Sequence, residues 1–270
     1  MKNLVYDCFM FFNELDLLEI RLNELDTVVD KFVLVECTKT HSLQSKPLYF
    51  EENKERYTKF LHKIIHVIVS DMPAEIEYQH HIDNFHRGCI MRGLGDALPD
   101  DLILISDLDE IPEASLINLK MPTPTVFSHQ CFGYALNIKV ESPQDIANWL
   151  GTVVIRNKDF DHTPIQTYRE SRREIALNSK IEGGWHYSYL GDAKTIFHKL
   201  KSFSHTEILE QFPSLSEDYI QNCINTTTDF LGFFRFPPHG AQHKKYSINE
   251  IHAPQYVLDN KEKFKHLIKS

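Results

Sequence analysis

The stretch that decides the fold reads Leu102-Ile103-Leu104-Ile105-Ser106-Asp107-Leu108-Asp109-Glu110-Ile111-Pro112. Its first four residues are apolar without interruption, which predicts a strand buried on both faces. Two further apolar runs, at 32–36 and 63–69, predict strands of the same kind, with helices expected at 51–61 and 75–98. Buried strands separated by helices indicate a parallel sheet, and such sheets bind ligands at the carboxyl ends of their strands.

The character of the sequence changes after Pro112. Segments at 125–139 and 152–156 are rich in β-branched and aromatic residues and predict strands added antiparallel to the first half. Beyond Asp192 the chain is expected to be mainly helical, with a loop at 236–240 and helices at 192–203, 216–225 and 260–268. The predicted fold class is therefore α/β, with a mixed sheet flanked by helices and a mainly helical C-terminal region.

Composition excludes several classes of protein. The 270 residues include 42% hydrophobic side chains, enough for one sizeable core, and the formal net charge is -9. That charge argues against nucleic acid and anionic lipid as partners. Five scattered cysteines without CxxC spacing argue against a disulfide framework or a zinc site. No apolar run approaches the length of a membrane span and no signal peptide is visible, so we expect a cytoplasmic protein.

The acidic residues after the third predicted strand suggest a cation. At strand periodicity Asp107 and Asp109 point the same way, while Leu108 points back into the core. Two carboxylates side by side repel each other, and Mn²⁺ or Mg²⁺ would resolve that conflict while keeping positions open for phosphate oxygens. The alternative is an acidic turn that caps a helix starting near Pro112.

Several motifs together resemble glycosyltransferase family seventeen. They include Asp107-Leu108-Asp109-Glu110-Ile111-Pro112, the opening segments at 6–9 and 13–25, Val33-Leu34-Val35-Glu36, Lys46-Pro47-Leu48, Gly183-Gly184-Trp185-His186 and Ala253-Pro254-Gln255-Tyr256-Val257-Leu258. The resemblance is spread over nearly the whole chain. It departs from the family at His86-Arg87-Gly88, where Gln-Arg-Asn is usual after an aromatic residue.

The resemblance implies a GT-A-like, Rossmann-related fold and an inverting enzyme. It also implies a UDP-sugar donor, UDP-N-acetylglucosamine in characterised members, together with a divalent metal and a glycan acceptor. We expect one glycosyltransferase domain over 1–270, with a nucleotide-sugar-binding half at 1–112, an acceptor half at 113–200 and a helical extension at 201–270.

The resemblance also suggests roles for particular residues. Asp109 is expected to bind the metal directly, Asp107 to bind the ribose or to reach the metal through water, and His186 to be a further metal ligand. Other expected donor contacts are Glu36, Thr38, Arg87, Arg172 or Arg173, and Trp185 stacked on a sugar. Glu182, Glu110, Asp192 and Glu113 are the candidates for the general base. His205 is expected to be structural.

Simpler interpretations stand beside these. Gly183 to His186 could form a tight turn with a packed tryptophan and a hydrogen-bonded histidine, Glu182 could be an exposed loop acid, and Glu36 could end its strand at the solvent. Other functions that also place carboxylates at strand ends are a metal-dependent nucleotidyltransferase or phosphohydrolase. An inactive carbohydrate-binding module is a third possibility.

Overall fold

The computed structural model describes residues 2–75, 81–141, 148–160, 163–202, 209, 211–230 and 242–270. The expectations for His205 and for a loop at 236–240 lie outside these residues.

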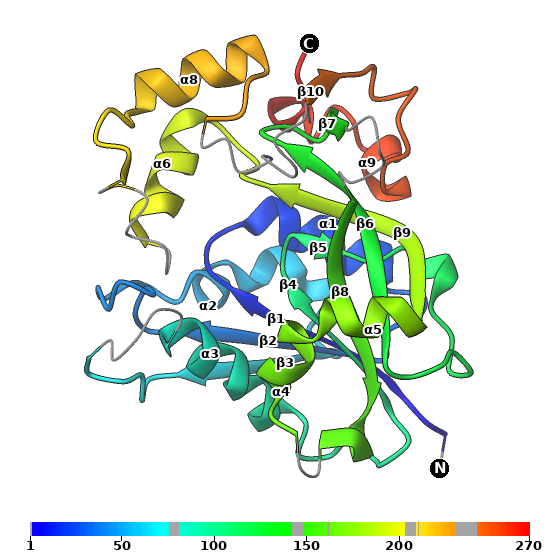
Figure 1. Ribbon diagram of the computed structural model, residues 1–270. Coiled ribbons are helices and arrows are strands. Elements are labelled where there is room, and N and C mark those ends of the chain that lie inside the picture. Colours follow the sequence, from blue (N-terminus) through cyan, green and yellow to red (C-terminus); the bar gives the residue numbers. More distant parts are fainter. Residues whose placement is uncertain are drawn as a thin grey trace.

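Four parallel strands form one half of a ten-stranded sheet, in the order β4-β1-β2-β3. These strands are β1 (Val5–Phe11), β2 (Lys31–Cys37), β3 (Ile64–Val69) and β4 (Leu102–Asp107) (Figure 1). The predicted strands at 32–36, 63–69 and 102–105 are confirmed. β1 was not expected and takes the central position between β4 and β2.

The other half of the sheet is mostly antiparallel. β8 pairs with β4, and the path continues through β6 and β7 to β10. β9 runs parallel to β6 and also pairs with the short β5. The strands are β5 (Glu110–Ile111), β6 (Thr125–Gly133), β7 (Ile138–Glu141), β8 (Asn148–Arg156), β9 (Lys180–Ser188) and β10 (Gln242–Lys245). The expectation of antiparallel strands joined to a parallel half is confirmed.

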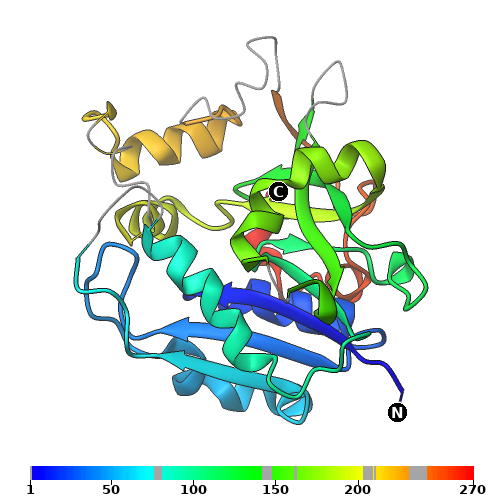
Figure 2. The ribbon, with the colours of Figure 1, turned by 60° about the horizontal axis from the view of Figure 1, so that its bottom comes forward.

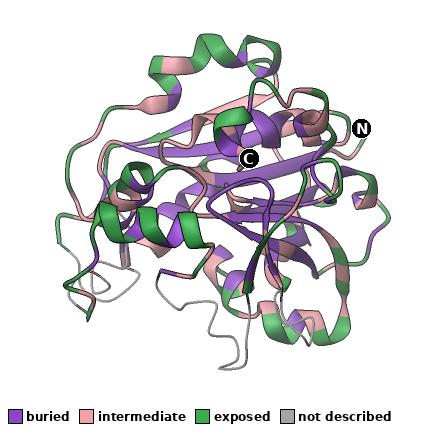
Figure 3. Cartoon of the chain, turned by 90° about the horizontal axis from the view of Figure 1, so that it is seen from above, coloured by how far each residue is buried: buried purple, intermediate pink, exposed green. Residues whose placement is uncertain are grey.

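Helices cover both faces of the parallel half, which is why its strands are apolar at every position. Leu102 and Leu104 pack in a cluster with α1 (Leu15–Leu25), while Ile103 and Ile105 pack with α3 (His81–Gly88). The second face is also covered by α4 (Ile165–Glu170) and α5 (Arg172–Asn178). Figure 2 shows α3 crossing this face, and Figure 3 shows buried strands enclosed by helices with exposed outer surfaces. The predicted arrangement, a mixed sheet flanked by helices, is confirmed.

Several expected helices are shorter than predicted. In place of 51–61 the chain forms α2 (Tyr49–Asn53) and a 3-10 helix (Lys54–Phe60). In place of 75–98, α3 continues as a 3-10 helix (Cys89–Gly93). Further 3-10 helices span Ala114–Leu116 and Asn157–Phe160.

The C-terminal region combines helices with a sheet strand. α6 (Ala193–Ser202) and α8 (Glu217–Thr226) agree with the predicted helices and pack against each other in a small cluster of their own. The prediction of a helix at 260–268 was wrong. The chain there makes turns and a 3-10 helix (Lys265–Leu267) after α9 (Gln255–Asp259). Within the described ranges, no helix is long and apolar enough to cross a membrane.

Candidate active site

The acidic motif lies at the carboxyl end of β4, the edge at which a parallel sheet binds its ligands. β4 ends at Asp107, Leu108 and Asp109 form a turn, and Glu110 begins β5. Directly after Pro112 the chain forms only a short 3-10 helix (Ala114–Leu116), whose N-cap is Glu113, so the motif does not cap an α-helix. Leu108 is buried, as expected, but the turn ends the strand periodicity, and the two aspartates therefore meet different partners.

A buried arginine binds the backbone of this turn from the core of the protein. Arg21, on α1, makes a two-pronged ion pair with Asp7 of β1, at 2.8 and 2.6 Å. It also donates to the backbone carbonyls of Asp107 (3.0 Å), Leu108 (3.1 Å) and Glu110 (2.9 Å). Both charged side chains are completely buried. The shape of the motif is thus fixed by a charged group in the core.

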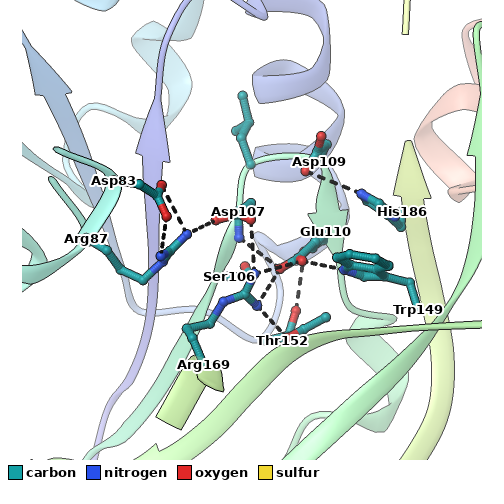
Figure 4. A network of polar contacts seen from close by, with 12 residues as sticks. Asp83, Arg87, Ser106, Asp107, Asp109, Glu110, Trp149, Thr152, Arg169 and His186 are labelled. Atoms are coloured by element: carbon teal, nitrogen blue, oxygen red, sulfur yellow. Dashed lines mark hydrogen bonds and ion pairs between the residues drawn. The ribbon is translucent and has the colours of Figure 1, made fainter. Parts of the chain in front are cut away.

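Asp107 is held by two arginines from the second face of the sheet (Figure 4). Arg87 of α3 donates to Oδ1 at 2.9 Å, and Arg169 of α4 donates to Oδ2 at 3.0 Å. Desolvation opposes the charge on Asp107, but Arg169 and Arg87 outweigh it and hold the pKa of this carboxyl well below its usual range. The sequence argument that a cation must bridge Asp107 and Asp109 is therefore corrected, because arginines already neutralise Asp107.

Glu110 is an inaccessible anchor within the same network. Its carboxylate accepts from Arg169 at 2.7 and 2.9 Å, from the indole of Trp149 at 2.6 Å and from the backbone of Asp107 at 2.9 Å. Burial favours the neutral acid, but Arg169 outweighs that effect and lowers the pKa of Glu110 to about 2. Glu110 is fully buried and only weakly basic, so it is suited to holding its neighbours in position and not to accepting a proton.

Asp109 lies on the opposite side of the turn and faces His186 and Lys199. Its Oδ1 is 3.9 Å from His186 Nε2, and its Oδ2 is 3.4 Å from Lys199 Nζ. Burial raises the pKa of Asp109 even though Lys199 and His186 act in the opposite direction. A partly buried carboxylate whose charge its neighbours do not fully offset is one that a further cation would stabilise.

Strand pairing brings His186 to this position. His186 lies in β9 directly opposite Glu110 of β5, and its ring stacks on Trp149 of β8 with centroids 4.7 Å apart. Its Nδ1 is 3.9 Å from the sulfur of Cys131, while Nε2 faces Asp109. The motif Gly183 to His186 is thus part of a strand, and neither a ligand-binding loop nor a tight turn.

The paired glycines bring β9 close to β5 and leave Trp185 in the core. Gly184 has φ of +94°, and a Cβ there would lie 2.3 Å from the carbonyl oxygen of Ile111. Trp185 is 1% exposed and donates from its indole to the carbonyl of His252 at 2.9 Å. Its ring is packed against protein in this structure, which leaves no face for a sugar.

Arg172 lies beside this network and has spare hydrogen-bonding capacity. Its guanidinium lies 5.5 Å from the Trp149 ring centroid and 3.7 Å from a Glu110 oxygen. Among the described residues its buried Nη1 has no hydrogen-bond partner. Burial, and to a lesser extent the charge of Arg169, lowers the pKa of Arg172 to about 10. This direction is expected where several positive side chains lie close together. Arg173 is exposed.

The remaining candidates for the general base lie at the periphery. Glu182 is exposed, pairs with Lys180 at 2.7 Å and accepts from Asn148 at 3.1 Å. Asp192 is exposed and accepts from the backbone of Thr195 at 2.8 Å, at the start of α6. Glu113 lies 3.7 Å from His252. None of these three contacts Asp109 or His186 in the described structure.

Glu36 and Thr38 are used by the fold at the end of β2. The fully buried Glu36 carboxylate binds Lys46 (3.3 Å), the backbone of Phe50 (3.2 Å) and His66 (3.1 Å). Thr38 donates from its hydroxyl to the carbonyl of Val69 at 3.4 Å. Glu36 therefore does not end its strand at the solvent. It holds the following loop in place.

Four side chains of this site were not singled out from the sequence as functional: Glu14, Trp149, Arg169 and Lys199. Glu14 follows β1 and lies 3.0 Å from Lys199, so it shares that lysine with Asp109. Arg169 and Lys199 lie in short helices in which a charged residue is most often exposed, and no local signal marks them.

Comparison with known proteins places the chain in a family. A sequence model of Glycosyltransferase family 17 matches residues 1–270. The chain is 25% identical over 295 residues to the Beta-1,4-mannosyl-glycoprotein 4-beta-N-acetylglucosaminyltransferase of Rattus norvegicus, covering 96% of this chain and 53% of that protein. The protein of the same name from Homo sapiens is 25% identical over 293 residues, with 95% and 53% coverage. The chain spans about half the length of these curated relatives. It belongs to glycosyltransferase family 17, and the predicted enzyme class, glycosyltransferase, is confirmed.

Two solved structures show weaker similarity. One is the apo-form glycosyltransferase GlyE of Streptococcus pneumoniae TIGR4, with 12% identity, a TM-score of 0.34 and coverage of 67% of this chain and 46% of that chain. The other is a glycosyltransferase involved in glycosylation of the major capsid of PBCV-1, with 12% identity, a TM-score of 0.30 and coverage of 66% and 80%. At TM-scores this low, neither bears on the site.

Proposed function

We propose that this enzyme transfers a sugar with inversion from a UDP-sugar, N-acetylglucosamine being the first candidate, to a glycan acceptor, with the help of Mn²⁺ or Mg²⁺. The observation that carries the proposal is that Asp109 faces His186 at the carboxyl edge of the parallel strands, with Lys199 beside Asp109 and Arg172 beside the adjoining Glu110 and Trp149. A carboxylate and an imidazole with cations on either side suit a diphosphate and its metal.

The donor set at Asp109 fits a divalent ion. Asp109 and His186 approach to 3.9 Å, which leaves room for an ion after a small adjustment, and burial raises the pKa of Asp109. In the described part of the chain no three His, Cys, Asp or Glu side chains converge on one point. Asp109 and His186 would therefore hold the ion, with donor phosphate oxygens and water as the other ligands. Asp107 would act by holding Arg87 and Arg169.

The chemistry divides between the two sides of the motif. A bound divalent ion would supply charge stabilisation to the departing UDP. Arg172, whose Nη1 makes no hydrogen bond within the described structure, would bind a phosphate oxygen, and Lys199 would offer a second positive charge. Asp107 and Glu110 would keep Arg87, Arg169 and Trp149 fixed while the donor enters and leaves.

The acceptor hydroxyl must lose its proton to a general base. Glu110 is poorly suited, since its pKa of about 2 and its complete burial both oppose proton uptake. Glu182 lies in the same strand as His186, four residues away, which corresponds to about 13 Å. Glu182 and Asp192 remain candidates only if the acceptor extends toward them.

Donor-stabilisation measurements test the proposal. Thermal unfolding would be followed with UDP-N-acetylglucosamine, UDP-glucose, UDP-galactose and GDP-mannose, each with and without Mn²⁺, and hydrolysis of each donor would be assayed in parallel. We expect stabilisation by a UDP-sugar that requires Mn²⁺ and is lost in Asp109→Ala and His186→Ala. The matched control is Asp71→Ala, which removes an exposed aspartate that pairs with Arg92 at the surface. No shift by any UDP-sugar with the wild-type enzyme would reject the proposal.

A further inference from the structure

Lys199 is a partly buried cation that the site holds against Asp109. It lies on α6, its Nζ is 3.0 Å from Glu14 Oε1 and 3.4 Å from Asp109 Oδ2, and its side chain is 22% exposed. Burial alone would lower the pKa of Lys199, but Glu14 and Asp109 outweigh it and raise that pKa above its usual value. The ammonium group therefore carries its charge at neutral pH, right beside the proposed metal ligand.

The helix that carries Lys199 lies beyond the carboxyl ends of β1 and β2. His198 stacks on Phe12, the residue after β1, with ring centroids 5.9 Å apart, and the carbonyl of Ser202 accepts from the backbone of His41 at 3.2 Å (Figure 1). These contacts flank Lys199 on both sides along α6. They hold this part of α6 at the carboxyl edge of the sheet, so the position of Lys199 is set by the packing of its helix.

A divalent ion at Asp109 would meet this charge at close range. The ion would compete with Lys199 for the same carboxylate and would be repelled by it in a partly desolvated setting, where charges interact strongly. An anion between the metal ion and Lys199 would replace this repulsion with attraction, because both cations attract the anion. A nucleoside diphosphate is such an anion.

We propose that Lys199 couples metal binding to donor binding, so that Asp109 binds a divalent ion tightly only when a nucleoside diphosphate is present to bridge the ion and the lysine. This inference rests on the proposed function and adds a positioning residue to it. In the ligand-free enzyme Lys199 neutralises Asp109 and Glu14. In the loaded enzyme its ammonium turns to the diphosphate, which its flexible four-carbon stem permits.

The coupling is measurable without turnover. Binding of Mn²⁺ would be followed by the loss of the free-ion EPR signal, with and without saturating UDP, and binding of UDP would be followed by calorimetry with and without Mn²⁺. Linkage requires the two couplings to be equal. For the wild type we expect UDP to tighten Mn²⁺ binding by about tenfold or more, within the usual range of coupling between sites.

Lys199→Met is the variant that separates the proposal from a structural role. Removing the charge frees Asp109, so Mn²⁺ alone should bind more tightly than to the wild type, while UDP in the presence of Mn²⁺ binds more weakly, and the coupling factor falls toward one. Lys201→Met is the matched control, because Lys201 is an exposed lysine on the same helix whose Nζ lies over the ring of Phe197. It should keep the coupling of the wild type.

A second variant keeps the test valid if Lys199→Met does not fold. Glu14→Gln removes one of the two carboxylates that neutralise Lys199 and leaves the ammonium beside Asp109, so Mn²⁺ alone should bind more weakly than to the wild type and the coupling factor should rise. An unchanged coupling factor in Glu14→Gln would count against the proposal. Equal weakening of Mn²⁺ and UDP binding in Lys199→Met, with an unchanged coupling factor, would overturn the proposal, as would loss of coupling in Lys201→Met. If the wild type itself bound neither Mn²⁺ nor UDP, the proposed function would fail first and this inference with it.

Discussion

Arg21 donates a hydrogen bond of 3.0 Å to the backbone carbonyl of Asp107, across 86 positions of sequence and through the core of the molecule. The same guanidinium is paired with Asp7 in the central strand, so the first helix and the first strand jointly determine where the acidic turn lies. The geometry of the site thus depends on an ion pair that no substrate touches. Its removal tests that dependence.

Arg21→Met should destabilise the protein by about 3 to 5 kcal/mol, because it leaves Asp7 charged, buried and unpaired, and leaves three carbonyls without their donor. Urea unfolding measures the change. Arg92→Met is the control: Arg92 pairs with Asp71 at the surface, and its loss should cost less than about 1 kcal/mol. Equal effects for the two variants would contradict the role given to Arg21.

Glu110→Gln and Glu182→Gln separate an anchoring carboxylate from a surface one. Glu110→Gln removes the counter-charge of Arg169 in a fully buried position, and should lower the free energy of unfolding by about 3 to 5 kcal/mol. Glu182→Gln, at an exposed position, should change it by less than about 1 kcal/mol. A transfer assay on the same pair tests the base: if Glu182 serves, its variant loses transfer and keeps Mn²⁺-dependent UDP binding.

Gly184→Ala should destabilise the protein by roughly 1 to 3 kcal/mol or more. The added Cβ meets the carbonyl oxygen of Ile111 at 2.3 Å, at a φ of +94° that alanine rarely adopts. Since Gly184 sets the approach of β9 to β5, Mn²⁺-dependent UDP binding should weaken as well. Gly95→Ala, where a Cβ meets nothing within 4 Å, is the matched control and should be close to neutral. If Gly184→Ala changed neither the stability nor UDP binding, the close approach of β9 to β5 would not require glycine.

Stability should fall as the pH decreases from 7 to 5. Burial lowers the pKa of His86 and of His129 to about 3, so between pH 6.5 and pH 3 the unfolded chain binds these protons and the folded chain does not. Each histidine then reduces stability by up to about 1.4 kcal/mol per pH unit over that window, and above pH 6.5 the effect disappears. Urea unfolding at pH 7, 6 and 5 measures the slope, and His129→Gln should make it shallower. A flat profile would contradict this assignment.

The sequence predicted the sheet well where its strands are uniformly apolar, as in Leu102 to Ile105. It did not reveal β1, whose Asp7 breaks the apolar pattern and becomes intelligible only once Arg21 is seen beside it. β9 was hidden for a related reason, because Gly183 and Gly184 are typical of turns, and here they permit two strands to approach. Both failures come from partners distant in sequence.

The candidate site was predicted in part. The position of Asp107, Asp109 and Glu110 at a strand end followed from the pattern, and the facing of Asp109 and His186 agrees with the grouping that the family resemblance implied. The different roles of the carboxylates could not be predicted from the pattern. They depend on which carboxylate is neutralised by Arg169 and which by Lys199, and no local sequence signal marks either residue. Charge balance at a site is a property of the folded surroundings.

The most direct test of the account is to locate the metal. Crystals grown with UDP and Mn²⁺ would be measured near the manganese absorption edge, and the anomalous difference map would show where the ion lies. The account predicts one strong peak about 2.2 Å from a carboxylate oxygen of Asp109 and from Nε2 of His186, with Asp107 still bound to Arg87 and Arg169. A peak coordinated by Asp107 in place of Asp109, or a UDP complex with no peak near His186, would contradict it.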